Sequence, residues 1–349
     1  MSKLICENLS VKYFGYDTAI SDVTTTFHDG INVLFAQEKG GKTTLLKAIA
    51  GIVPYVGLIT LDGVSLSELS IKERDFQMLF DDYGLFTRRS ARYNLEYPLR
   101  IRKVPKAERK RMVEEVAALF DLDIMLDAPV YRLNEWLKVA LVLCRAYLRR
   151  PKVLLIDNIF SKLDLVSRKE AFLRFLPMFQ DGIVIYATDS VEEAASLSKE
   201  IKFLSYGYLI QEGSPFDFKT APQSVSAFCA FQEYSTVLPA VAIKNGLSVG
   251  EKDFAVSVKL KNDIYLGKTV LAGFAPTQFA LSEDGFPAVI KMIFYFGERA
   301  LFSATTEAGD VFFYCDKDLS VGETVNLSIT GVAGVFDALN ERNVTEVAE

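Results

Sequence analysis

One stretch of the chain, residues 36–44, carries the residue types that hold phosphate groups in proteins. It matches the spacing G-x-x-x-x-G-K-[ST], with Ala36 at the first glycine. In such a loop, backbone N–H groups cradle phosphate oxygens at the positive end of a helix dipole. Lys42 would reach the outer phosphates, and the Thr43 hydroxyl would hold Mg²⁺. We therefore predict a nucleotide site formed by Ala36, Lys39, Gly40, Gly41, Lys42, Thr43 and Thr44.

The segments on either side of this loop are those that the motif needs. Residues 31–35 form an apolar run that predicts a buried strand, and residues 45–51 have a helical pattern with Gly51 as the C-terminal stop. This order favours a nucleotide loop over a surface turn, which is the alternative for a Gly-Lys-Thr triplet alone. Ala36 departs from the pattern, because alanine tolerates a positive φ less well than glycine.

Length, charge and composition limit the classes of protein that fit. At 349 residues, half of them apolar, the chain is long enough for two domains. The net charge of −6 provides no basic excess for nucleic-acid phosphates, so we expect no nucleic acid partner. Four scattered cysteines and a single histidine disfavour metal sites and His-based triads, and fit a reducing compartment. No apolar run approaches the ~18 residues of a membrane span, and the first residues lack the apolar core of a signal peptide.

A small antiparallel sheet is expected ahead of the phosphate loop. Residues 3–13 and 17–29 alternate as strands do, around a turn at 14–16. Tyr13 or Phe14 either stacks on an adenine or packs as an ordinary strand aromatic. Local residues leave both alternatives open.

Strand and helix patterns alternate through the first two thirds of the chain. Their order is that of a doubly wound α/β layout, with a helical subdomain inserted at about 87–150. From about residue 239, short strands and turns indicate an all-β, barrel-like segment, so we predict domains at 1–236 and 237–349. The expected further strands are 57–61, 76–80, 152–157 and 182–187, and the expected turns of the β segment are 245–246, 283–285 and 308–310.

Two further stretches, 99–108 and 210–215, are very like those of a known family. With the phosphate loop and the landmarks below, they make the chain resemble the ATP-binding subunit of ABC transporters, of the maltose and glycerol-phosphate sugar-importer type. The resemblance implies an α/β P-loop NTPase core (RecA-like) with an antiparallel β subdomain and an inserted helical subdomain. It also implies a C-terminal all-β, OB-like (TOBE) regulatory domain, and ATP and Mg²⁺ as ligands. Lys39 stands where the family usually has glycine.

The family's catalytic landmarks that touch the reacting phosphate are altered in this sequence. Residues 154–157 resemble the Walker B strand, with Asp157 orienting Mg²⁺. The family's water-polarising glutamate is replaced by Asn158, and an amide cannot accept a proton. The family's glutamine falls at Asp81 and its switch histidine at Asp189, where a carboxylate repels phosphate.

Two motifs of the family's dimer seam can also be placed. The signature, which reads L-S-G-G-Q in the family and donates to the γ-phosphate across the dimer, is here Leu133-Asn134-Glu135-Trp136-Leu137. An acid and a bulky ring thus stand where a bare backbone is needed. Ser161, Leu163 and Asp164 match the D-loop, although the same residues read alone would start a helix.

The resemblance implies a degenerate ATP-binding subunit, or pseudo-ATPase, of an importer. It would lie on the cytoplasmic face of the membrane and pair with a second, more ordinary ATP-binding subunit. Tyr83, Leu85 and Phe86 would dock on permease subunits, unless these side chains belong to the core. The alternatives are a regulatory or scaffold protein without a transport role, and a slow working ATPase in which Asp81 replaces the missing base. Sugar is the expected cargo class, with iron and polyamines left open.

Overall fold

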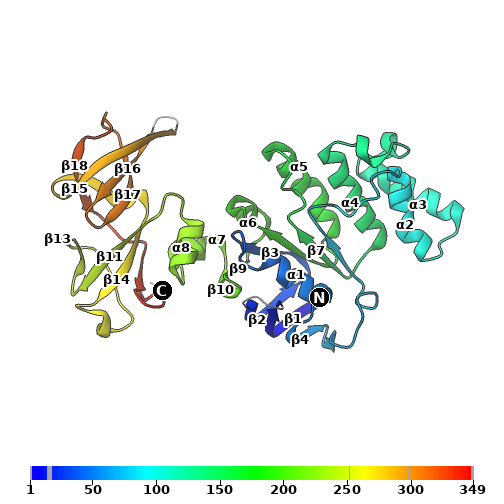
Figure 1. The fold of residues 1–349 in the computed structure, drawn as a ribbon, viewed down its shortest axis with the longest axis horizontal. Coiled ribbons are helices and arrows are strands. Elements are labelled where there is room, and N and C mark those ends of the chain that lie inside the picture. The colour runs from blue at the N-terminus through cyan, green and yellow to red at the C-terminus, as the bar shows by residue number, and fades with distance from the viewer. Residues whose placement is uncertain (1, 14–17, 251, 297–298, 347–349) are drawn as a thin grey trace. The chain divides into compact units, whose positions relative to one another are not determined.

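The computed structural model describes residues 2–13, 18–250, 252–296 and 299–346. Internal contacts divide the chain into two compact units, Met1–Glu212 and Gly213–Glu349, and each is described below by itself (Figure 1). Among the described residues, no helix has the length and apolar character needed to cross a membrane.

A six-stranded sheet with the order β10-β9-β3-β8-β7-β6 forms the centre of the first unit. β3 pairs in parallel with β8 and β9, and β7 pairs in parallel with β6 and β8. β7 and β8 are buried along their whole length, which explains their nearly continuous apolar sequences. The carboxyl ends of these parallel strands meet at one edge, where ligands bind in such sheets. The strands are β3 (Gly30–Ala36), β6 (Phe76–Leu79), β7 (Val153–Asp157), β8 (Ile183–Thr188), β9 (Ile201–Ser205) and β10 (Tyr208–Gly213).

A second, antiparallel sheet with the order β2-β1-β4-β5 packs with the central sheet around helix α1 (Lys42–Ala50). One buried cluster joins side chains of this sheet, of α1 and of β3, β7 and β8. Gly51 ends α1 with a φ of 76°, as the helical pattern predicts. The expected turn at 14–16, including Phe14, lies outside the described residues. The strands are β1 (Lys3–Lys12), β2 (Thr18–His28), β4 (Val56–Leu61) and β5 (Val64–Ser65).

Helices cover the other side of the central sheet and form the inserted subdomain. Three of them, gathered at one end of this unit in Figure 1, occupy the stretch expected at about 87–150. They pack with the helix that follows β7 into one buried cluster. The helices are α2 (Ala91–Ile101), α3 (Lys106–Leu119), α4 (Glu135–Arg149), α5 (Leu165–Phe175) and α6 (Val191–Leu197), with short 3₁₀ turns η1 (Asp123–Met125), η2 (Val130–Arg132) and η3 (Leu176–Phe179).

The second unit is rich in β-structure. Two sheets, with the orders β13-β12-β11-β14-β19 and β17-β16-β15-β18, share one buried apolar cluster. Its elements are α7 (Pro215–Thr220), α8 (Val225–Phe231), η4 (Asp263–Tyr265), η5 (Pro276–Gln278), β11 (Thr236–Ile243), β12 (Gly246–Val249), β13 (Lys252–Phe254), β14 (Thr269–Phe274), β15 (Phe279–Phe296), β16 (Arg299–Thr306), β17 (Gly309–Cys315), β18 (Thr324–Ile329) and β19 (Gly334–Asp337).

Turn signals in this unit were misplaced by the sequence reasoning. The expected turn at 283–285 is wrong, because β15 runs through it with a bulge: Leu281 and Phe286 both pair with Leu327. A Cβ on Gly285 would lie 2.4 Å from the Leu327 backbone, so this glycine permits close strand approach instead of a turn. The hairpins expected at 245–246 and 308–310 turn one residue earlier, since Gly246 and Gly309 already pair within strands.

The contacts place the division between the units at 212/213, whereas the sequence prediction placed a domain boundary at 236/237. The difference concerns α7 and α8. The ring of Phe228 on α8 lies 6.0 Å from that of Phe336, and the Val225 N–H donates to the Glu341 carbonyl. These contacts join residues 213–236 to the β-rich unit.

Candidate nucleotide-binding site

The predicted phosphate loop connects the carboxyl end of β3 to the first turn of α1. Ala36 is the last residue of β3 and is buried in extended backbone, so alanine needs no positive φ there. The left-handed positions come later, at Lys39 with a φ of 63° and at Gly41 with a φ of 102°. Lys39 keeps its side chain exposed, and the loop therefore accepts both residues that depart from the pattern.

The glycines are needed because the loop is approached closely from two sides. A Cβ on Gly40 would lie 2.8 Å from the Cβ of Ala36, and a Cβ on Gly41 would lie 2.7 Å from the side chain of Ile20. The Gly207 N–H also donates to the Gly40 carbonyl over 3.1 Å. A pocket of about 490 Å³ opens over the loop, lined by Thr18, Ala19, Lys39, Gly40, Gly41, Lys42, Thr43, Thr44 and Tyr206.

Two aromatic side chains lie at or near this pocket. Tyr13 is 37% exposed, and its hydroxyl lies 3.4 Å from that of Thr44, which places the predicted aromatic next to the loop. Sequence reasoning missed Thr18 and Tyr206. Tyr206 is 87% exposed on the turn between β9 and β10, far from the loop in sequence, and no local signal pointed to it.

The Mg²⁺ residues predicted from the sequence lie against each other. The hydroxyl of Thr43 hydrogen-bonds the carboxylate of Asp157, which is buried at the end of β7. Burial raises the pKa of the Asp157 carboxyl, and the Thr43 hydrogen bond and the Lys42 charge oppose that shift. The described residues hold no cluster of three His, Cys, Asp or Glu side chains that would bind a metal alone. A hydroxyl and one carboxylate fit Mg²⁺, which completes its coordination with phosphate oxygens and water.

The three positions predicted to be altered catalytic positions follow the carboxyl ends of adjacent parallel strands. Asn158 comes directly after β7, in a left-handed conformation with a φ of 54°. Asp189 comes directly after β8, and its carboxylate lies 3.8 Å from the Lys42 ammonium. Asp81 is exposed after β6 and is near enough to Asp157 for its charge to favour a higher Asp157 pKa. Asp189 is thus brought to the nucleotide loop, and Asp81 is brought near Asp157.

Comparisons with known proteins agree with this geometry. A family profile described as "ABC transporter" matches residues 21–161. The sn-glycerol-3-phosphate import ATP-binding protein UgpC of Bordetella avium is 27% identical over 95% of each chain. The Fe(3+) ions import ATP-binding protein FbpC of Escherichia coli K12 is 31% identical over 82% of this chain and 83% of its own. The chain belongs to the ABC transporter family.

A solved structure confirms the fold class. The cbiO1 protein of Clostridium perfringens, described as part of the ABC transporter complex cbiONQ, superposes with a TM-score of 0.56 at 21% identity. The match covers 61% of this chain and 89% of that one. The predicted P-loop NTPase core with a β-rich C-terminal region is therefore the ABC ATP-binding fold.

The stretch predicted as a degenerate signature, Leu133–Leu137, leads into the start of α4, and its side chains have partners within the chain. The Asn134 side chain caps the helix by accepting from the Leu137 N–H over 2.9 Å. The carboxylate of Glu135 accepts from the Tyr83 hydroxyl over 2.9 Å and from the Lys138 ammonium over 2.8 Å. Trp136 is half-buried, with its ring 5.4 Å from that of Phe175. The acid and the bulky ring therefore stabilise this subdomain.

The D-loop of this ABC chain ends in a helix cap. Asp164 accepts from the Val166 and Ser167 N–H groups at the start of α5, so the helix-start alternative and the D-loop position coincide. Leu163 is buried and Ser161 is exposed. Arg168 of α5 donates to the carbonyl oxygens of both, each over 3.1 Å, and holds the loop against its own helix.

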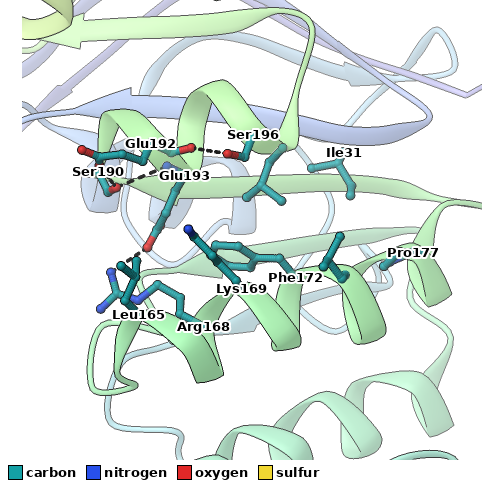
Figure 2. A pocket seen from close by; sticks show the side chains of 12 residues that line it. Ile31, Leu165, Arg168, Lys169, Phe172, Pro177, Ser190, Glu192, Glu193 and Ser196 are labelled. Carbon is teal, nitrogen blue, oxygen red and sulfur yellow. Dashed lines mark hydrogen bonds and ion pairs between the residues drawn. The ribbon is translucent and has the colours of Figure 1, made fainter.

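Arg168 also connects the D-loop to the segment after β8. It forms an ion pair of 2.8 Å with Glu193 of α6 (Figure 2). The buried carboxylate of Glu193 also accepts from the hydroxyls of Tyr186 and Thr188. This pair lies beside a mainly apolar pocket of about 390 Å³ between α5 and α6, walled by Phe172 among others (Figure 2). Thr188 directly precedes Asp189 in the chain. The Arg168–Glu193 ion pair therefore connects the D-loop to the segment that carries Asp189.

The predicted docking residues differ from one another in exposure. Tyr83 is only 6% exposed and bonds Glu135, so it belongs to the core, as the alternative in the sequence reasoning had it. Leu85 is half-buried against the same cluster. Phe86 is 41% exposed, with its ring 4.8 Å from that of Tyr97. Phe86 is the member of this set with an appreciable surface.

Proposed function

We propose that this chain is the ATP-binding subunit of an ABC importer, and that it binds Mg-ATP but hydrolyses it poorly. The observation that carries the proposal is the contrast at the ends of β3 and β7. Lys42, Thr43 and Asp157 form the arrangement that phosphate and Mg²⁺ require, whereas the next residue, Asn158, has no basic group.

Binding and catalysis draw on different residues of this edge. The loop amides and Lys42 would hold the phosphates, and Thr43 and Asp157 would hold Mg²⁺, which neutralises phosphate charge when bound. Catalysis also needs a group that accepts the proton of the attacking water, typically worth ~10²–10⁴ in rate. Asn158 cannot take that role, and Asp189 adds negative charge where the reaction needs positive charge.

Partners follow from the relatives. The curated relatives are named as import ATP-binding proteins, and we infer that this chain acts with membrane permeases at the cytoplasmic face. We infer that residues around Leu85 and Phe86 dock on a permease. Because Glu135 and Trp136 fill the signature, the chain is proposed to pair with a second, more ordinary ATP-binding subunit. Residues 237–349 are proposed as an OB-like (TOBE) regulatory domain.

The proposed cargo class is carbohydrate-like. The glycerol-phosphate relative spans 95% of both chains, which supports this class, whereas the iron importer relative supports the competing assignment. Growth of a deletion strain on sugar phosphates, set against growth on ferric iron as the limiting nutrient, separates the two.

The deciding experiment is a calorimetric titration of the full chain with Mg-ATP, beside Lys42→Ala. The matched control is Lys199→Ala, an exposed lysine just before β9, at the sheet edge opposite the loop. We expect binding that is lost in Lys42→Ala and kept in Lys199→Ala. Equal binding by all three proteins, or no binding at millimolar ATP by the unmodified chain, would show that the loop does not bind ATP.

A further inference from the structure

The ammonium of Lys42 already has an anionic partner within the chain. It lies 3.8 Å from the Asp189 carboxylate and donates to the Ala36 carbonyl over 3.1 Å. The Lys42 side chain is 11% exposed, so this ion pair is sheltered on the lysine side, while Asp189 is 49% exposed. In a phosphate loop, this ammonium is the group that reaches the outer phosphates.

The charges around this lysine are more negative than the family pattern provides. One carboxylate of the pattern is absent, because Asn158 replaces a glutamate. Two are added, because Asp81 replaces a glutamine and Asp189 replaces a histidine. Asp189 lies beside Lys42, and Asp81 is near enough to Asp157 for their negative charges to repel, while Lys42 and Lys47 are the cations whose charges act on Asp157.

We propose that Asp189 makes this a site for nucleoside diphosphates in preference to triphosphates. The inference rests on the nucleotide binding proposed above and specifies its ligand. The loop amides and helix N-terminus serve the phosphates that ADP and ATP share. The third phosphate needs Lys42, for which Asp189 competes, and it brings further negative charge beside that carboxylate. The repulsion between the third phosphate and the Asp189 carboxylate therefore weakens ATP binding. Water partly screens this repulsion, because Asp189 is half-exposed.

The test compares Mg-ADP and Mg-ATP titrations of the full chain, of Asp189→Asn and of Asp181→Asn. Asp181 is an exposed residue two positions before β8, at the opposite end of that strand, so its variant matches the change in net charge. We expect the unmodified chain to bind ADP about tenfold tighter than ATP, the scale of one screened charge pair. Asp189→Asn should tighten ATP about tenfold and change ADP by less than about threefold, and Asp181→Asn should change neither.

The salt dependence of binding gives a second readout. Raising NaCl from about 0.05 M to about 0.5 M should reduce the difference in affinity between ADP and ATP in the unmodified chain, because salt screens the repulsion between Asp189 and the third phosphate. If Asp189→Asn does not give a folded protein, Asp189→Ser removes the same charge. Two results would overturn the inference and leave nucleotide binding intact. One is tighter binding of ATP than of ADP by the unmodified chain, and the other is a ratio of ATP to ADP affinity in the Asp189 variants that equals the ratio in the unmodified chain. If neither nucleotide binds, the proposed function falls as well.

Discussion

The nucleotide loop and the signature stretch depart from the family pattern in different ways. At the loop, Ala36 and Lys39 are accommodated without disturbing Lys42, Thr43 or Asp157. At the signature, Glu135 and Trp136 make contacts within the chain. Two residues that depart from the signature pattern thus pack against side chains of the same chain. We therefore expect changes at the loop to alter nucleotide binding with little effect on stability, and changes at the signature to do the reverse.

The largest effect is expected from restoring a base beside the loop. Asn158→Glu should raise phosphate release from Mg-ATP about 10²-fold, the lower end of the general-base contribution, because Asp189 and the altered signature remain. Asn158→Gln is the matched control. It carries the same side-chain length and the same left-handed strain at φ 54° but has no basic group. If both variants bind nucleotide and hydrolyse it at the same rate, the missing base is not the cause of slow hydrolysis.

The second-largest effect is expected from a substitution that removes packing at the signature stretch. Trp136→Ala removes a half-buried ring from its contact with Phe175 and should lower the free energy of unfolding by about 2 kcal/mol. Urea denaturation measures this loss, and ADP affinity should stay within a factor of about two. Leu173→Ala, at a side chain 81% exposed on α5, is the control and should change stability by less than about 0.5 kcal/mol. If Trp136→Ala leaves stability unchanged but alters nucleotide affinity, Trp136 acts on nucleotide binding and not on packing, which contradicts the comparison.

A smaller loss of stability is expected from the substitution Tyr83→Phe. The ring stays packed while the 2.9 Å hydrogen bond to the Glu135 carboxylate is removed, which should cost about 1 kcal/mol in urea denaturation. Tyr131→Phe, at a side chain that is 61% exposed, provides the control for loss of a hydroxyl. If Tyr83→Phe is as stable as its control but weakens capture of a permease partner, Tyr83 acts at an interface and its core assignment is wrong.

Much of the nucleotide edge could be predicted because its signals are local. The spacing from Ala36 to Thr43 specifies a strand, a loop and a helix within a few residues. The apolar run that ends at Asp157 predicts a buried parallel strand, and parallel strands bring their carboxyl ends together. The order of these elements predicts that both residues lie at one edge of the sheet, and the resemblance to the ABC family added the pairing of Thr43 with Asp157 around Mg²⁺.

What the sequence did not reveal depends on contacts between distant segments. Nothing near Asp189 predicts that it pairs with Lys42, and nothing near Tyr206 predicts that it lines the loop pocket. Trp136 was judged by the role of its position in the family, whereas its contact with Phe175 arises from the packing of α4 against α5. Gly285 signalled a turn but serves a close strand contact, because a glycine permits either.

The smallest effect comes from the charge of Glu135 and should depend on pH. The Lys138 hydrogen bond is the main cause that lowers the pKa of Glu135 below its usual 4.5, and Tyr83 contributes. A lowered pKa means that the folded protein binds fewer protons here than the unfolded chain. The resulting stability is therefore present above pH 4.5 and is lost as the pH falls through the folded pKa.

Glu135→Gln should thus cost a few tenths of a kcal/mol, roughly 0.5, at neutral pH, since the carboxylate is partly exposed. Urea denaturation of both proteins at neutral pH and at about pH 3 measures the difference, which should be smaller at the lower pH. A difference of the same size at both pH values would mean that the Glu135 side chain stabilises α4 through its shape and not through its charge.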